Sequence, residues 1–265
     1  MPKTCVVIAR EVWDTRDLVG AVLDETGALK ESALATRFEP EDLNALEAAL
    51  RLKDQAGWRV LALGLGTPGP VDVLRECLYR GADGAFRVGE DIRKLDTGAR
   101  AKLLAAAIRK IGGVDLILSG TTSMIEGETS LLSGHLAARL GWESLSYVDQ
   151  IESCDETRLT VKRAVEMGYE TLQAPLPCVA ALGVALLEDD PRAPRSAKAM
   201  LKLKHKKTDI PTWTVAELGE VGAPESTVLR AGFEAVPQRV VNTQTVDPDS
   251  EAALAAMLAD ARKGD

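Results

Sequence analysis

The sequence predicts an α/β fold, with a mostly parallel sheet covered by helices on both faces, added antiparallel strands and an extended C-terminal arm. Short apolar runs, typical of parallel strands covered on both faces, alternate with amphipathic segments up to about residue 140. Hydrophobic residues make up 46% and charged residues 27% of the 265 residues, as in an ordinary globular protein. Aromatic residues make up only 4%, which favours layered strands and helices over an aromatic-rich sandwich.

The first elements can be read from apolar runs and their flanking turn residues. Residues 4–9 form a continuous apolar run and predict the first strand. Residues 19–23 and 28–35 predict a small hairpin, because Gly27 suits the left-handed turn position between them. Residues 40–56 predict an amphipathic helix that begins at a proline and ends before a glycine.

The alternation of strand and helix then continues. Further strands are predicted at 59–63, 84–88 and 114–119, and helices at 71–79, 97–111 and 129–140. Past residue 140 the pattern changes to strand-like segments with short turns, where the sheet is expected to gain antiparallel strands; they are residues 146–154, 158–165, 169–174 and 178–182. A last helix is predicted at 250–262. We therefore predict a domain over residues 1–185, followed by a basic segment and arm over 186–265.

Charge is distributed unevenly along the chain. The 32 basic and 40 acidic residues give a net charge of −8, which argues against a surface that grips nucleic acid or an anionic membrane throughout. The segment 191–207 nevertheless carries seven basic residues and no acid, so the rest of the chain sums to −8 − 7 = −15. It contains no aromatic ring to stack a base. A solvated face and a docking surface for an acidic protein are the two interpretations that remain.

Neither membrane insertion nor metal binding is indicated. No apolar run approaches the roughly 18–20 residues that span a bilayer, and the first residues lack the features of a signal peptide, so we expect a cytoplasmic protein with no transmembrane segment. Four cysteines are scattered singly and only two histidines are present. We therefore expect unpaired thiols, mostly buried, and no metal site.

One glycine-rich loop matches a dinucleotide fingerprint. Gly64, Gly66 and Gly69 follow the G-x-G-x-x-G pattern between a predicted strand and helix. Pro68 and Pro70 remove backbone N–H groups that a pyrophosphate would need. A tight strand-to-helix turn is the favoured interpretation. An NAD-dependent oxidoreductase that uses this loop is the alternative, although its histidines lie within a predicted helix and the lysine run.

A second loop, residues 120–130, follows a strand and precedes a helix. It combines glycines and hydroxyl groups with Glu126 and Glu128, at the position where open α/β sheets bind ligands. Its backbone N–H groups could hold a phosphate near a helix N-terminus. Capping of that helix by Thr129 or Ser130, with exposed acids, explains the same residues without a ligand.

Several ordered motifs resemble the β subunit of electron-transfer flavoproteins, over roughly residues 3–220. Residues 40–53 (PEDLNALEAALRLK) are similar to the family's segment that begins N-P-F and ends R-L-K. Further matches are residues 81–83 (GAD), 114–118 (VDLIL), 169–172 (YETL) before a Leu-Pro pair, and 191–192 (PR) with 198–200 (KAM) and the following lysines. The resemblance implies a Rossmann-like, adenine-nucleotide-binding fold and an electron carrier that is not itself an enzyme.

The resemblance also implies partners and cofactors. The chain would form a heterodimer with an α subunit that holds most of the redox FAD. Its own pocket would hold AMP, or a second FAD in electron-bifurcating members. The pocket would be lined by Ile8, Ala9, Glu39, Pro40, Glu41, Asp42, Leu65, Gly66, Gly120, Thr121, Thr122, Ser123, Glu126, Gly127, Glu128, Thr129 and Ser130. A flavin dehydrogenase similar to acyl-CoA dehydrogenases would dock at Arg192, Arg195, Ser196 and Met200. A stand-alone nucleotide-binding module is a further alternative.

Three positions depart from the pattern of simple carriers. Residues 125–129 (IEGET) are closer to the I-D-G-D-T of bifurcating members, so AMP and FAD both stay open. Glu39 stands where asparagine is usual, which places an acid near a phosphate position. Ser196 replaces a leucine anchor in the docking loop, which predicts a different choice of partner. Arg10 or Trp13, at the end of the first strand, would be placed to tune a flavin.

Overall fold

The computed structural model describes residues 2–14, 30, 35–69, 71–91, 95–122, 131–183, 193–219, 226–227 and 250–261. The chain forms two compact units. The first comprises Met1–Val22 and Lys30–Ala231, and the second comprises Leu23–Leu29 and Gly232–Asp265. The hairpin predicted at 19–23 and 28–35 lies almost wholly outside the described residues.

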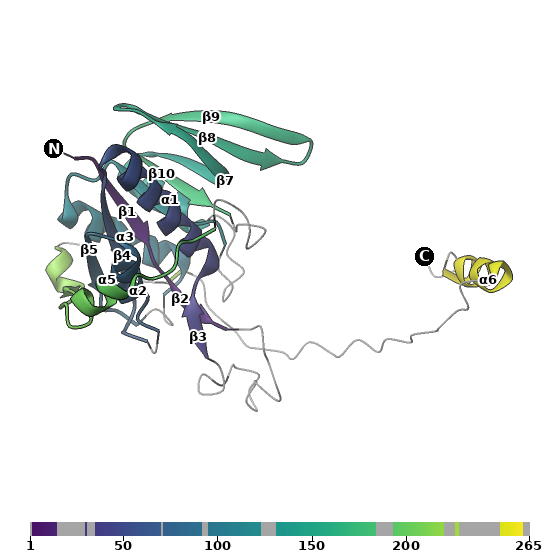
Figure 1. Ribbon diagram of the computed structural model, residues 1–265, viewed down its shortest axis with the longest axis horizontal. Coiled ribbons are helices and arrows are strands. Elements are labelled where there is room, and N and C mark those ends of the chain that lie inside the picture. The colour runs from purple at the N-terminus through teal and green to yellow at the C-terminus, as the bar shows by residue number, and fades with distance from the viewer. Residues whose placement is uncertain are drawn as a thin grey trace. The chain divides into compact units, whose positions relative to one another are not determined.

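The described part of the first unit is built around one nine-stranded sheet, in the order β11-β5-β4-β1-β6-β10-β7-β8-β9 (Figure 1). The strands are β1 (Thr4–Ile8), β4 (Arg59–Leu65), β5 (Gly84–Val88), β6 (Leu116–Gly120), β7 (Glu143–Cys154), β8 (Arg158–Val165), β9 (Gly168–Pro175), β10 (Cys178–Leu182) and β11 (Thr212–Trp213). Pairing is parallel from β11 to β7 and antiparallel from β7 to β9. The predicted α/β class with a mostly parallel sheet is confirmed.

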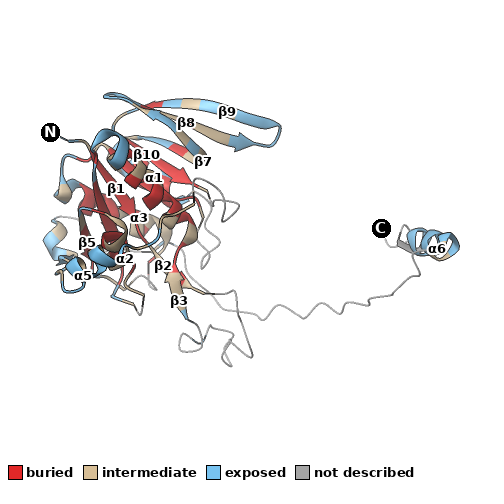
Figure 2. Ribbon diagram, viewed as in Figure 1, coloured by how far each residue is buried: buried red, intermediate tan, exposed pale blue. Residues whose placement is uncertain are grey.

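Helices cover the two faces of the parallel strands. One core cluster joins α1 (Pro40–Ala56) and α2 (Val73–Arg80) to one face. The other joins α3 (Thr97–Ile111) and α4 (Leu131–Leu140) to the opposite face. Figure 2 shows the buried residues concentrated in these central strands and the helices against them. Every residue of β1 is buried because both faces are covered, as its continuous apolar run predicts.

Helix ends follow the capping residues in the sequence. Pro40 occupies the first turn of α1, and Gly57 ends the helix with a left-handed φ of 68° while its N–H donates to the Lys53 carbonyl at 2.9 Å. At α3, the Asp96 side chain accepts from the Ala99 N–H at 2.8 Å. The predicted limits of both helices are therefore confirmed.

The position of β10 corrects one expectation. Residues 178–182 were expected among the antiparallel strands, yet β10 pairs in parallel with both β6 and β7 near the centre of the sheet. Its five residues are all apolar and all buried, as in β1, whereas β7 to β9 have mixed burial. A strand covered on both faces belongs in the middle of a parallel sheet, and the short connection from β9 concealed this. Antiparallel pairing is confirmed for β7, β8 and β9.

A separate two-stranded antiparallel sheet follows β1. Its strands are β2 (Glu11–Trp13) and β3 (Thr36–Phe38), in the register Val12 opposite Arg37. This sheet has only three residues in each strand, too short for a clear alternation, and was not predicted. All four cysteines are free thiols and three are buried, as expected.

The described segment 193–219 belongs to the first unit. It contains α5 (Ala199–His205), the edge strand β11 beside β5, and the 3₁₀ turn η3 (Ala216–Leu218). The predicted domain boundary at residue 185 stays a prediction about function. In its packing, the segment 193–219 belongs to the same unit as the sheet. Within the second unit, α6 (Glu251–Ala261) lies close to the predicted 250–262.

Candidate functional site

The ends of β1 and β6 meet the first turn of α1 at the carboxyl edge of the sheet. Arg10 follows β1 and Asp42 lies in α1, where its side chain is fully buried. The Arg10 Nε donates to Asp42 Oδ2 at 2.8 Å and the Nη2 donates to Oδ1 at 2.8 Å, a bidentate pair. Asp42 Oδ1 also accepts from the Gly120 N–H at 2.7 Å. The Asp42 carboxylate therefore joins three segments that are distant in sequence.

A glycine is required where β6 approaches α1. A Cβ on Gly120 would lie 2.6 Å from the Cβ of Glu41 and 3.0 Å from the backbone nitrogen of Asp42. The Glu41 carboxylate accepts from the Thr122 N–H, and the Thr122 carbonyl accepts from Arg10 Nη2 at 2.9 Å. The close approach at Gly120 thus serves packing of the helix against the strand.

The predicted pocket residues are partly brought together. Ala9 lies beside the end of β4, since its N–H donates to the Leu63 carbonyl at 2.9 Å, and this places Leu65 and Gly66 at the same edge. Two contacts join the first turn of α1 to the end of β6: Asp42 accepts from the Gly120 N–H, and Glu41 accepts from the Thr122 N–H. The Glu39 N–H donates to the Arg10 carbonyl at 3.0 Å, and Pro40 and Thr121 adjoin these residues in sequence. Ile8 lies in the hydrophobic core cluster. The remaining pocket predictions lie outside the described residues: Ser123, Glu126, Gly127, Glu128, Thr129 and Ser130.

Two hydroxyl groups at the end of β6 have no hydrogen-bond partner among the residues that the structure describes. Ser119 and Thr121 are 1% and 4% exposed, and neither Oγ nor Oγ1 makes a hydrogen bond. A buried hydroxyl without a partner costs free energy, on the order of 1–3 kcal/mol. Side chains alternate along a strand, so both lie on the face of α3 and α4, while Gly120 faces α1. The edge of the sheet at Thr121 therefore offers an unused donor and acceptor.

The chemistry of this edge fits a nucleoside better than a phosphate. Glu39 is 1% exposed, and Glu41 and Asp42 follow it, so the first turn of α1 presents acids where an anion would need donors. Acids and hydroxyls suit the ribose hydroxyls and the exocyclic amino group of an adenine nucleoside. The Arg10 guanidinium, the one cation in the described network, is already paired with Asp42.

Side chains of the protein fill the space beside the glycine loop of residues 64–69. A Cβ on Gly64, inside β4, would lie 3.2 Å from Leu74 of α2, and the Gly66 N–H donates to the Val88 carbonyl at 2.9 Å. Beside Gly69 lies the carboxylate of Glu11, which accepts from the Val71 N–H at 3.0 Å. An acid therefore stands where a pyrophosphate would bind, so the turn interpretation is favoured over the dinucleotide interpretation.

The predicted docking segment is fixed at one residue. Arg195 donates to Glu47 Oε2 from its backbone N at 3.0 Å and from its Nε at 2.8 Å, and to Glu47 Oε1 from its Nη2 at 3.1 Å. Its Nη1 donates to Asp54 Oδ2 at 2.8 Å. Burial alone would raise the pKa of Glu47, but hydrogen bonds from Arg195 and Arg51 outweigh it and lower that pKa.

Helix α2 binds the chain at the C-terminal end of this segment, at residues 205–208. Arg75 Nη1 donates to the carbonyls of His205, Lys206 and Thr208 at 2.7, 3.1 and 3.1 Å. These carbonyls lie at and beyond the C-terminal end of α5, where a cation is favourable. The clamp from α1 and α2 therefore holds both ends of residues 195–208.

The surface between the clamped ends is exposed. Met200 and Leu203 are 82% and 80% exposed, one turn apart on α5, and Ser196 is also exposed. The predicted docking residue Arg192 lies outside the described residues. Glu47 and Asp54 were not predicted as functional, although Glu47 within the family-like helix motif and its Arg51 partner four residues on mark that helix face.

Comparison with known proteins decides the family. Residues 26–218 match the family described as the electron transfer flavoprotein domain. The chain belongs to the electron transfer flavoprotein β-subunit family. Electron transfer flavoprotein subunit beta of Thermoanaerobacterium thermosaccharolyticum is 31% identical over 94% of this chain and 89% of that protein.

Other family relatives carry different names. Caffeyl-CoA reductase-Etf complex subunit CarD of Acetobacterium woodii is 35% identical over 66% of this chain and 66% of that protein. Protein FixA of Azorhizobium caulinodans is 33% identical over 81% of this chain and 76% of that protein. The family consists of electron-transfer subunits rather than catalytic enzymes.

The described part of the chain contains neither a helix that could span a membrane nor a cluster of metal-binding side chains. No described helix is both long enough and apolar enough to cross a membrane. Within the same residues, no group of three or more His, Cys, Asp or Glu side chains is arranged to hold a metal ion.

Proposed function

We propose that this chain is the β subunit of a heterodimeric electron transfer flavoprotein. It holds an adenine nucleotide, AMP or a second FAD, at the carboxyl edge of its sheet, and it presents residues 193–207 to a flavin dehydrogenase. The α subunit holds most of the redox FAD, which supplies the electron-transfer chemistry when bound. The family match over residues 26–218 supports the proposal most directly.

The carboxyl edge supports a nucleotide at this position. The Thr121 hydroxyl, which has no partner among the described residues, lies at the end of β6 on the face of α3 and α4, and the buried acids Glu39 and Glu41 lie at the start of α1 on the other face of the same edge. Open α/β sheets bind ligands at the carboxyl ends of their strands. A bound nucleoside would give the Thr121 hydroxyl the hydrogen bond that the protein alone does not supply.

The docking role rests on the clamped segment. One end is fixed by the pair between its Arg195 and Glu47 of α1, and the other by Arg75 of α2, while the apolar Met200 and Leu203 stay exposed between lysines. A preorganised segment loses little entropy on binding, and apolar anchors within a charged rim are typical of protein interfaces. The departure at Ser196 predicts a partner different from that of simple carriers.

Purification with the natural partner tests the proposal. We expect a yellow heterodimer with a flavin spectrum, and release of the nucleotides decides between the two β-pocket ligands: two FAD per heterodimer, or one FAD and one AMP. A colourless homodimer that binds NAD would favour the oxidoreductase instead. A colourless chain that binds an adenine nucleotide without a partner would favour a stand-alone module.

The Thr121→Val variant tests the site itself. Valine has nearly the same shape as threonine, so the variant without nucleotide should be as stable as the wild type, or more stable, because the lost hydroxyl has no partner. Loss of one hydrogen bond of about 1–1.5 kcal/mol should weaken nucleotide affinity roughly tenfold. Equilibrium dialysis after nucleotide removal measures this, with Ser133→Ala on α4 as a control. Unchanged affinity in a folded Thr121→Val protein would remove Thr121 from the pocket.

A further inference from the structure

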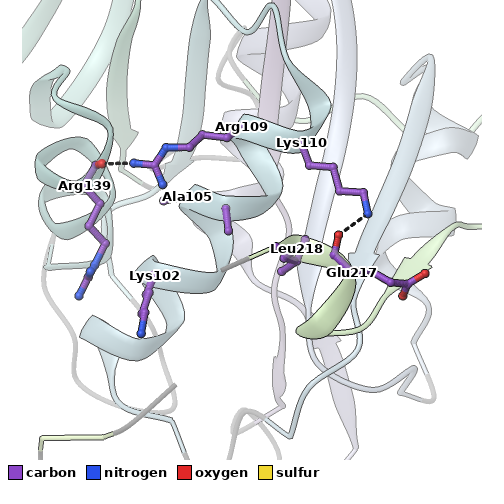
Figure 3. A pocket seen from close by; sticks show the side chains of 9 residues that line it. Lys102, Ala105, Arg109, Lys110, Arg139, Glu217 and Leu218 are labelled. Carbon is purple, nitrogen blue, oxygen red and sulfur yellow. Dashed lines mark hydrogen bonds between the residues drawn. The ribbon is translucent and has the colours of Figure 1, made fainter. Parts of the chain in front are cut away.

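A basic hollow lies on the outer side of α3, on the opposite face of the sheet from α1. It has a volume of about 770 Å³ and is bounded by α3, the end of α4 and the turn η3 (Figure 3). The small side chains of Ala105 and Ala106 and the neighbouring Leu218 lie within its wall. The volume falls within the range of roughly 300–1,000 Å³ that is usual for small-molecule sites.

Four cationic side chains from two helices surround the hollow: Lys102, Arg109, Lys110 and Arg139. Arg109 is positioned by its hydrogen bond to the Arg139 carbonyl, and the Lys110 Nζ donates to the Glu217 carbonyl at 2.6 Å. Lys110 also lies over the Trp213 ring, 5.0 Å from its centroid. These contacts use neutral partners, so they fix the two cations in place without neutralising them.

The other two cations have no counter-charge. In the part of the chain that the structure describes, neither the Lys102 ammonium nor the Arg139 guanidinium forms an ion pair. Figure 3 shows both side chains on the same side of the hollow, reaching from neighbouring helices. Like charges gathered in this way repel one another unless an anion lies between them.

Glu217, the one acid among the described lining residues, interacts with the charge of Lys110 and offsets the four cations only in part. Glu217 accepts hydrogen bonds from the Thr214 N–H at 2.7 Å and the Thr214 hydroxyl at 2.9 Å, and these bonds lower the pKa of Glu217. Figure 3 shows its carboxylate directed away from the hollow. The described lining residues carry four positive charges and one negative charge, hence 4 − 1 = +3, in a chain whose net charge is −8.

We propose that this hollow binds a small multivalent anion, a phosphate-bearing compound, independently of the nucleotide at the carboxyl edge. The described lining residues include no aromatic side chain, and the nearby Trp213 ring is already stacked on Phe86 with centroids 4.9 Å apart. Recognition is therefore by charge rather than by a stacked base. Cations converging on a concave space favour a compact anion over the flat surface of an acidic protein.

Calorimetric titration of the full chain, purified with its partner subunit and its nucleotides retained, tests this inference. Inorganic pyrophosphate is the probe, at low and at physiological salt. We expect one site per chain with an affinity that falls as salt rises. The Lys102→Gln/Arg139→Gln variant should weaken pyrophosphate binding at least tenfold, since each charged hydrogen bond contributes on the order of 1.5–3 kcal/mol.

The matched control is Arg158→Gln/Lys162→Gln on β8, which changes the net charge equally at a distant site and should bind as the wild type does. Equal weakening in both variants would reduce the effect to overall charge and overturn the proposal. So would pyrophosphate binding that is unchanged in the Lys102→Gln/Arg139→Gln variant or absent from the wild type. If wild-type protein binds no pyrophosphate while the variant associates more weakly with its partner subunit, the hollow is an acidic-protein surface and the small-anion site is refuted.

Discussion

Replacing Glu47 by glutamine should release the docking segment from α1. Arg195 would lose a charged acceptor for three N–H groups, and the amide that replaces it turns donors toward the guanidinium. The Glu47 side chain is only 6% exposed and that of Arg195 is 23% exposed, so the pair lies between an exposed and a buried ion pair. Asp54 still accepts from Arg195, which limits the loss.

The magnitude follows from this intermediate burial. Exposed pairs contribute about 0–1 kcal/mol, whereas breaking a buried pair costs about 3–5 kcal/mol. We expect about 2 kcal/mol for Glu47→Gln, which for a unit of this size lowers the melting temperature by about 4–8 °C. Asp54→Asn removes the other acceptor of Arg195, but that carboxylate is 60% exposed, so its loss should cost less than about 1 kcal/mol.

Hydrogen exchange and partner affinity measure the effect together. In Glu47→Gln, amides of residues 195–206 should exchange faster and binding to the proposed flavin dehydrogenase partner should weaken, with the content of the proposed nucleotide unchanged. Because the pKa of Glu47 is lowered on folding, the stabilisation is present above about pH 4.5 and is lost as the pH falls further. The reasoning is refuted if Glu47→Gln and Asp54→Asn have equal effects, or if neither alters exchange in this segment.

Two further changes probe the packing and the charge of the same unit. Gly120→Ala should destabilise by about 1–3 kcal/mol because its Cβ would press on Glu41 and the Asp42 backbone, and urea unfolding checks this. Gly134→Ala in α4, where no atom lies within 4 Å of the added Cβ, should be neutral or stabilise by up to about 1 kcal/mol; similar losses for both would contradict the close approach at Gly120. Changing all four lysines within residues 202–207 to serine should slow association with the dehydrogenase and flatten its salt dependence in stopped-flow measurements. An unchanged rate would leave the run as solvated surface.

Local signals predicted the elements well where a residue has one conformational role. The limits of α1 follow from Pro40 at its start and Gly57 after its end. The fixed φ of proline favours the first turn of a helix and the left-handed φ of glycine ends the last turn, so both effects can be read from the local sequence. The continuous apolar run of β1 likewise identifies a strand covered on both faces. The prediction that residues 178–182 form an antiparallel strand was wrong. The short turn before β10 indicates only that another strand lies nearby, whereas the position of β10 in the sheet depends on which strands can bury its apolar side chains.

The site depends on pairs that no local pattern marks. Arg10 and Asp42 are separated by 32 residues, and Arg195 and Glu47 by 148. Each arginine also had a plausible separate role in the sequence, as a flavin-tuning residue or a docking residue. Family motifs mark segments of the chain, whereas the pairing between these segments required the fold. The basic hollow could not be predicted from the sequence for the same reason, since its cations are spread over α3 and α4.

The central place of β10 also governs the order in which this chain can complete its fold during synthesis. Residues 178–182 lie between β6 and β7, so the sheet's middle stays open until the ribosome has passed the whole β7 to β9 meander. Until then β6 and β7 present unpaired backbone edges, the state in which parallel sheets are most prone to wrong pairing. A fragment that ends before residue 178 would lack the strand that joins β6 to β7, and chaperone contact during synthesis should be strongest in that interval.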